Sequence, residues 1–228
     1  MDIYGLEKLS LVDYEGMMCA TVFTGGCNFN CPFCHNAGLI KKQAQKLDTK
    51  DVLNYLGERR KLLDAVTISG GEPTLENDLA GFIRQVKGMG YKVKLDTNGT
   101  RPEVVKELIE QNLLDYVAMD IKNNFDDYSP ITGVIFPWVD KVKETLSILT
   151  NSNIKYELRT TLVKEYHKMS NILQLAEDLK GQKVLYLQKF VDSGNINQSG
   201  LNDVDKETAK TFQTELSKTI TNVYLRGY

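Results

Sequence analysis

Short apolar runs alternate along the chain with longer segments whose apolar residues recur every three or four positions. The runs are rich in β-branched and aromatic residues and predict strands, whereas the longer spacing predicts helices. The predicted strands span residues 17–23, 65–69, 93–97, 116–122, 155–161 and 184–190. The helical spacing is clearest at residues 104–109, 142–149, 172–179 and 209–216. Strands that alternate with helices predict βαβ units with right-handed crossovers and a parallel α/β sheet.

The sequence gives no sign of a boundary between independent domains, because it contains no low-complexity tract and no linker rich in Pro, Gly or Ser. We therefore expect one domain over residues 1–228. Residues 1–16 predict an irregular lead-in or a small hairpin. Residues 192–203 predict a long loop before the last helix.

Polar and charged residues gather where each predicted strand ends. In a parallel sheet these ends meet at one edge, which is where α/β folds bind ligands. Alternation along a strand directs Asp120 and Lys122 to the side opposite Val117 and Met119. The same alternation directs Arg159 to one face of its predicted strand, and directs Asp96 and Asn98 to one face of another. A closed barrel would fill its interior with Val, Ile and Leu, so inward charges predict a partial (β/α)6 TIM-like barrel that holds a polar ligand.

The overall charge excludes two classes of function. The chain has 228 residues, with 28 Lys and Arg against 30 Asp and Glu, a formal net charge of −2. This balance argues against binding nucleic acid or a membrane surface through bulk positive charge. No targeting signal and no run of about 20 apolar residues is visible, so we expect a cytoplasmic protein.

Three of the four cysteines form a C-x3-C-x2-C cluster, at Cys27, Cys31 and Cys34. Thiolates are soft ligands that favour zinc or iron–sulfur clusters, and a reducing compartment keeps them free to bind metal. Structural zinc sites usually close with four ligands, and this chain has no second cysteine pair. His35 is a poor fourth ligand because adjacent side chains rarely converge on one ion. Cys19, inside a predicted strand, is expected to be a core residue.

The cysteine cluster, with Phe33 before its last member, resembles the signature of the radical S-adenosylmethionine (SAM) enzymes. Gly70, Gly71 and Glu72 after the second predicted strand resemble the GGE motif of the same family. The stretches TGGCNFNCPFCHN, SGGEPTL and LDTNGT look most like the glycyl-radical-enzyme activating enzymes, in particular the anaerobic ribonucleoside-triphosphate reductase activating proteins. Two departures from the activase pattern are Gln188, near the end of the sixth predicted strand, and Tyr14 in the lead-in.

The resemblance implies a set of roles. The three cysteines would bind one 4Fe-4S cluster, whose fourth iron would be chelated by SAM. Gly70, Gly71 and Glu72 would meet the SAM amino group. The resemblance also implies that Phe33 and His35 lie against the adenine. Asp96 and Asn98 would lie near the ribose or near a monovalent cation that Asp120 would share. Lys122 and Arg159 would bind the SAM carboxylate, and Lys122, Asp120 and Arg159 would form the catalytic set.

The implied activity is reductive cleavage of SAM to a 5′-deoxyadenosyl radical that abstracts a glycine Cα hydrogen from a partner. That partner would be a glycyl radical enzyme of the anaerobic ribonucleotide reductase or pyruvate formate-lyase type. Flavodoxin or ferredoxin would donate the electron. Two alternatives stay open: a small-molecule radical SAM enzyme resembling the 7-carboxy-7-deazaguanine synthases, and a non-catalytic zinc-binding module.

Overall fold

The computed structural model describes residues 1–134, 138–192 and 194–228. The chain divides into two compact units. The first comprises residues 1–28, 38–118 and 141–155, and the second comprises residues 29–37, 119–140 and 156–228. Among the described residues, no helix is long and apolar enough to cross a membrane.

The first unit is built on four strands that pair in sequence order. They are β1 (Ile3–Ser10), β2 (Cys19–Thr24), β3 (Ala65–Gly70) and β4 (Lys92–Thr97). Strand β1 pairs with β2 antiparallel, and β2, β3 and β4 are parallel. The helices that accompany these strands are α1 (Ala37–Ile40), α2 (Thr49–Arg59), η1 (Pro73–Leu75), α3 (Leu79–Gly88), α4 (Pro102–Glu110) and α6 (Val139–Asn151).

Sequence explains where several of these helices start. Asp48 caps α2, since its side chain accepts a hydrogen bond from Lys50 N at 2.8 Å. Pro102 opens α4, where a missing N–H costs nothing. Helix α3 presents Leu79, Phe82 and Ile83 as a buried face, the spacing expected of an amphipathic helix.

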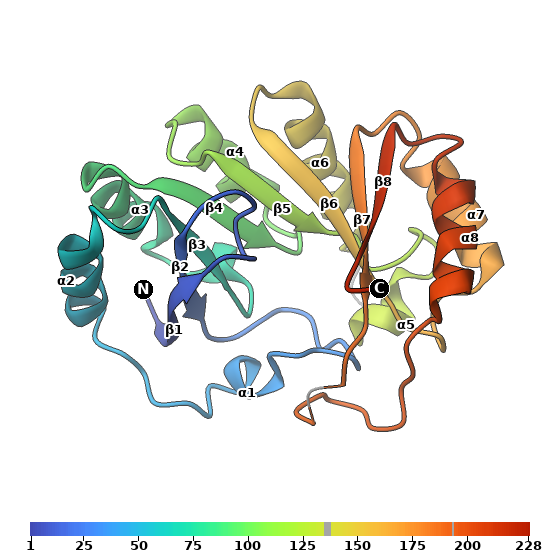
Figure 1. The fold of residues 1–228 in the computed structure, drawn as a ribbon, viewed down its shortest axis with the longest axis horizontal. Coiled ribbons are helices and arrows are strands. Elements are labelled where there is room, and N and C mark those ends of the chain that lie inside the picture. Colours follow the sequence, from blue (N-terminus) through green and yellow to red (C-terminus); the bar gives the residue numbers. More distant parts are fainter. Residues whose placement is uncertain (135–137, 193) are drawn as a thin grey trace. The chain divides into compact units, whose positions relative to one another are not determined.

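Strand β5 (Tyr116–Asp120) leads from the first unit into the second. The second unit continues with α5 (Tyr128–Thr132), β6 (Lys155–Leu162), α7 (Met169–Asp178), β7 (Val184–Lys189), α8 (Lys206–Leu216) and β8 (Asn222–Arg226). Strands β6, β7 and β8 are parallel neighbours. Helices α7 and α8 lie side by side next to these strands (Figure 1).

The structure confirms the predicted fold class, a mostly parallel α/β sheet of the partial-barrel type whose strands follow sequence order. All six predicted strands are present, with shifted ends. The lead-in forms β1, and β8 is a further strand that the apolar pattern did not predict. Strand β5 ends at Asp120 instead of residue 122. The N–H of Ile121 still donates to the carbonyl of Arg159 on β6, but that of Lys122 donates to the Tyr128 hydroxyl.

Apart from residue 193, which lies outside the described part, residues 192–203 contain no helix and no named strand. A single bridge joins Asp203 to Val163. Asn197 donates from its amide to Asn30 Oδ1 at 3.2 Å and to the Cys31 carbonyl at 3.0 Å. This loop therefore packs against the segment that carries the second cysteine.

Candidate active site

The carboxyl ends of β2 and β3 approach each other so closely that only glycine fits. Gly70 has a φ of +114°, and a Cβ there would overlap the backbone of Thr24. A Cβ on Gly71 would overlap the carbonyl of Gly26. The N–H of Gly71 donates to Thr24 O at 2.9 Å and that of Glu72 to Gly26 O at 2.8 Å. The close contacts of Gly70 and Gly71 with the Thr24–Gly26 backbone thus hold the start of the cysteine loop against the turn after β3.

The carboxylate of Glu72 is buried and ties the end of β3 to the end of β4. It accepts hydrogen bonds from Thr97 Oγ1 at 2.8 Å and Asn98 N at 2.7 Å, and from both the N–H and the hydroxyl of Thr74. Burial raises the pKa of Glu72, and these hydrogen bonds oppose the rise. The side chain therefore has a structural function within the first unit.

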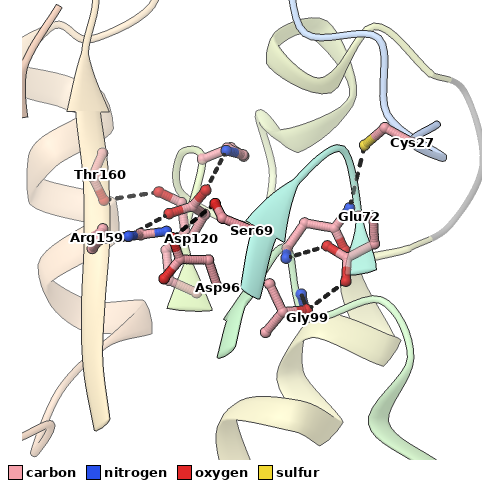
Figure 2. A network of polar contacts seen from close by, with 12 residues as sticks. Cys27, Ser69, Glu72, Asp96, Gly99, Asp120, Arg159 and Thr160 are labelled. Carbon is pink, nitrogen blue, oxygen red and sulfur yellow. Dashed lines mark hydrogen bonds and ion pairs between the residues drawn. The ribbon is translucent and has the colours of Figure 1, made fainter. Parts of the chain in front are cut away.

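Asn98 links this turn to the first cysteine (Figure 2). Its Nδ2 donates to Asn28 Oδ1 at 2.9 Å and lies 3.8 Å from Cys27 Sγ. Its Oδ1 accepts from Thr100 N at 3.0 Å and from Thr100 Oγ1 at 2.7 Å. Asn98 is 5% exposed, so its side-chain amide is held in one orientation and does not rotate freely in solvent.

Asp96, two residues earlier on β4, accepts a hydrogen bond from Ser69 Oγ at 2.9 Å (Figure 2). Its other oxygen lies 3.4 Å from Lys94 Nζ, which is almost fully buried. Asp96 and Asn98 both take part in hydrogen bonds at the end of β4.

In the second unit, Asp120 joins the two cations that the sequence singled out (Figure 2). Its Oδ2 lies 2.9 Å from Lys122 Nζ and its Oδ1 lies 2.8 Å from Arg159 Nε. Burial raises the pKa of Asp120, but the adjacent Arg159 and Lys122 outweigh it and lower the pKa to about 2. Burial opposes the charge on Lys122, and the Asp120 carboxylate overcomes it and raises the pKa of the lysine. All three groups are charged at neutral pH, with one net positive charge.

The second and third cysteines belong to the same unit as this charged group. The N–H of Cys34 donates to the Cys31 carbonyl at 3.1 Å and closes a tight turn. Phe33 between them is buried, and Lys122 Nζ lies 5.9 Å from the centre of its ring. His35 packs against Phe190, with ring centres 5.7 Å apart. Burial and then Lys122 lower the pKa of His35, so this imidazole is neutral at pH 7.

The cysteines fit a soft metal centre by their chemistry. Burial raises the pKa of Cys31 to about 11 and raises that of Cys34, so without metal both are thiols at neutral pH. Metal coordination would deprotonate them. Among the described residues, no three His, Cys, Asp or Glu side chains form a ready-made metal group; Cys27 belongs to the first unit and the other two to the second. Three thiols fit an iron–sulfur cluster with one iron left for another ligand.

Several residues at these sites were not predicted from the sequence. Asn28 and Thr100 hold the Asn98 amide in the first unit. Tyr128 and His167 contact the backbone of Lys122 in the second, and Asn197 contacts the cysteine loop. Asn28 and Thr100 carried a signal, since they lie inside the stretches TGGCNFNCPFCHN and LDTNGT, and Asn197 lies in the predicted loop 192–203. Tyr128 and His167 lie in no stretch that the sequence singled out.

Comparison with known proteins assigns the class to which this fold and these residues belong. The sequence profile of the Radical SAM superfamily matches residues 21–179. The chain belongs to the radical SAM superfamily. It is therefore an enzyme of a family that uses a 4Fe-4S cluster and SAM, which excludes the non-catalytic zinc-binding module.

Individual relatives narrow the class. The chain is 34% identical over 192 residues to "Putative glycyl-radical enzyme activating enzyme MJ1227" of Methanocaldococcus jannaschii, covering 82% of this chain and 79% of that protein. It is 30% identical over 186 residues to the pyruvate formate-lyase-activating enzyme of Clostridium pasteurianum, covering 78% and 76%. Within the superfamily, the chain belongs to the family of glycyl-radical enzyme activating enzymes.

A solved structure supports the fold. The crystal structure of Streptococcus suis SuiB bound to S-adenosylmethionine superposes with a TM-score of 0.69 at 14% identity, over 90% of this chain and 49% of that one. At this identity the likeness concerns the fold alone.

Proposed function

We propose that this enzyme activates a glycyl radical enzyme, of the anaerobic ribonucleotide reductase or pyruvate formate-lyase type. The observation that carries the proposal is the similarity, over most of both chains, to the relative named as a glycyl-radical enzyme activating enzyme. Bound together, the cluster and SAM supply a one-electron cleavage of the sulfonium that yields methionine and a 5′-deoxyadenosyl radical, which takes a hydrogen atom from the Cα of one glycine of the partner.

In this proposal Cys27, Cys31 and Cys34 hold the cluster as thiolates. The support is the chemistry of the three thiols and the way their backbone is restrained. The glycine contacts with the turn after β3 fix the residues before Cys27, and the Cys34 N–H to Cys31 carbonyl bond fixes the second pair. Such restraint lowers the conformational entropy that the loop loses when its thiolates bind one cluster.

Lys122 and Arg159 are proposed to bind the carboxylate of SAM. The support is their shared partner, Asp120, which holds both cations and leaves one net positive charge for an incoming anion. The SAM amino group is a donor and needs acceptors. The N–H groups of Gly71 and Glu72 are already donated to carbonyls, so this turn would offer the amino group its carbonyl oxygens.

Phe33 and His35 are proposed to lie against the adenine, which the aromatic and neutral character of these rings suits. Asp96 and Asn98 would serve the ribose. A monovalent cation near Asp96 and Asp120 would have to compete with Lys94 at the first carboxylate. At the second it would compete with Lys122 and Arg159.

The partner and the electron donor complete the proposal. The partner is a protein, because the hydrogen to be removed lies on a backbone Cα of a glycine. The donor is proposed to be flavodoxin or ferredoxin, since the reaction consumes one electron for each SAM that is cleaved.

The test begins with anaerobic reconstitution of the enzyme with iron and sulfide, followed by SAM and dithionite. We expect about four iron atoms per chain, 5′-deoxyadenosine in the products, and a glycine-centred electron paramagnetic resonance signal once the correct glycyl radical enzyme is added. Cys31→Ala should lose both cluster and SAM cleavage, whereas Cys19→Ala, whose thiol is buried beside Ser10 and Thr67, should keep both.

The outcomes separate the alternatives. SAM cleavage without a glycyl radical in any candidate partner, together with turnover of a small molecule, would refute the activase and support the enzyme resembling 7-carboxy-7-deazaguanine synthases. Absence of SAM cleavage in the reconstituted wild type would refute both.

A further inference from the structure

His167 is a buried histidine to which none of the roles described above is assigned. It is 2% exposed and lies between β6 and α7. Its Nδ1 lies 3.0 Å from the backbone N of Val163, and its Nε2 lies 3.0 Å from the carbonyl oxygen of Lys122. Both partners have fixed roles, because a backbone N–H donates and a carbonyl accepts.

These partners define the protonation of the ring. Nδ1 accepts from Val163 N, so the hydrogen of the neutral imidazole is on Nε2 and is donated to Lys122 O. Nδ1 also lies 3.2 Å from the Val163 carbonyl, a contact that would need a hydrogen on that nitrogen. Burial disfavours the doubly protonated ring and lowers the pKa of His167, although the two backbone bonds oppose this. The neutral form with hydrogen on Nε2 satisfies the two shorter contacts.

Other side chains hold the same short segment. The hydroxyl of Tyr128 accepts from Lys122 N at 3.2 Å and lies 3.4 Å from the Asp120 carbonyl. Thr160 Oγ1 donates to the Ile121 carbonyl at 2.8 Å. Strand β5 ends at Asp120, and beyond it these side chains and the imidazole hold the carbonyl of Ile121 and the N–H and carbonyl of Lys122.

We propose that His167 is a positioning residue for Lys122: the imidazole fixes the lysine carbonyl, and with it the direction in which the ammonium group leaves the backbone. That ammonium lies 2.9 Å from Asp120 Oδ2 and 5.9 Å from the Phe33 ring centre. The inference rests on the proposed function only for the ligand of Lys122, the carboxylate of SAM.

Two substitutions separate positioning of Lys122 from support of the 163–167 turn. In His167→Gln, the amide nitrogen can take the place of Nε2 and still donate to Lys122 O. In His167→Asn, the amide oxygen can take the place of Nδ1 and still accept from Val163 N, but the bond to Lys122 is lost. We expect SAM affinity, measured by anaerobic equilibrium dialysis with the oxidised cluster, to fall about tenfold in His167→Asn and by less than about threefold in His167→Gln.

A coupling measurement makes the test specific. In a Lys122→Ala background, His167→Asn should weaken SAM binding no further, because the side chain that it positions is absent. Equal SAM affinity in both His167 variants and wild type, a larger loss in His167→Gln, or an additive effect in the Lys122→Ala background would each overturn the proposal.

The ring protonation gives an independent readout on the wild type, whether or not a variant folds. The chain has two histidines, so a long-range proton–nitrogen correlation spectrum of protein labelled at histidine contains two imidazoles. We expect the buried one to carry its hydrogen on Nε2, and a hydrogen on Nδ1 would overturn the inference. If the wild type bound no SAM, the proposed function would fail while this spectrum still tested the geometry of His167.

Discussion

Removal of the Asp120 charge is the most direct test of the electrostatics in the second unit. Asp120→Asn keeps the shape of the side chain but leaves Lys122 and Arg159 without their shared carboxylate. Both cations are largely buried, with 16% and 13% of their side chains exposed, so water screens them poorly. The substitution should therefore destabilise the folded protein.

The magnitude follows from the pKa of Asp120, which falls from the usual 3.8 to about 2. Since a tenfold change in an equilibrium constant is about 1.4 kcal/mol, the charge contributes roughly 2 kcal/mol to the free energy of unfolding at neutral pH. A carboxylate whose pKa is lowered by folding stabilises the protein above its unfolded-state pKa. The contribution should be complete at pH 5 and roughly halved near pH 3, because there the carboxylate is largely protonated in the unfolded chain and still ionised in the native protein.

The assay is urea unfolding of wild type and Asp120→Asn without metal, at pH 7 and at several values down to pH 3. Glu144→Gln is the matched control, because Glu144 pairs with Lys141 at 3.2 Å on the exposed face of α6. An exposed pair of this kind contributes about 0.5 kcal/mol or less. A deficit in Asp120→Asn no larger than that of the control, or one that stays constant from pH 7 to pH 3, would refute the reasoning.

Three further predictions use the same purified protein. Gly71→Ala should lower the free energy of unfolding by about 1–3 kcal/mol, because its Cβ would overlap the carbonyl of Gly26. Gly57→Ala, in helix α2 with open space around it, should raise the free energy of unfolding by about 0.5–1 kcal/mol. Equal effects of the two substitutions in urea unfolding would contradict the steric argument. Asn197→Ala should speed amide hydrogen exchange in the cysteine loop by removing two hydrogen bonds, and unchanged exchange would show that the loop does not depend on it. Glu72→Gln should cost about 1–3 kcal/mol in thermal unfolding, because its amide would put a donor where the carboxylate accepts; wild-type stability would show that the network tolerates a donor.

Hydrophobic periodicity was enough to predict the parallel strands, because a strand buried on both faces is a nearly continuous apolar run. Strand β3, with four buried residues at its start, is of this kind. The strands at either end of the order lack that signal. Strand β1 has three exposed residues in its second half, and β8 has a single buried residue, Val223. Their pairing depends on neighbours far away in the sequence, which no local pattern reveals.

The charged group of the second unit could be anticipated in part. Alternation along two strands directed Asp120 and Arg159 to one side, and the structure joins them at 2.8 Å. The strand was predicted to continue through Lys122, yet it ends two residues earlier. The reason is that Tyr128 and His167 bind the backbone of Lys122, and a pattern of hydrophobic residues contains no information on hydrogen bonds from side chain to backbone.

The hydrogen-bond partners of the acidic residues at the strand ends explain why these residues have different roles. Glu72 belongs to a motif that suggested ligand binding, but its carboxylate accepts hydrogen bonds from Thr74, Thr97 and Asn98 within the first unit. Asp120 accepts from two cations and leaves a positive surplus, so its neighbours keep a charge for an anion. A carboxylate surrounded by neutral donors connects strands, whereas one shared by two cations leaves a net positive charge beside it. Substitution should therefore separate them: loss of the Glu72 charge should change stability in the first unit, and loss of the Asp120 charge should change both stability and the affinity of Lys122 and Arg159 for a carboxylate.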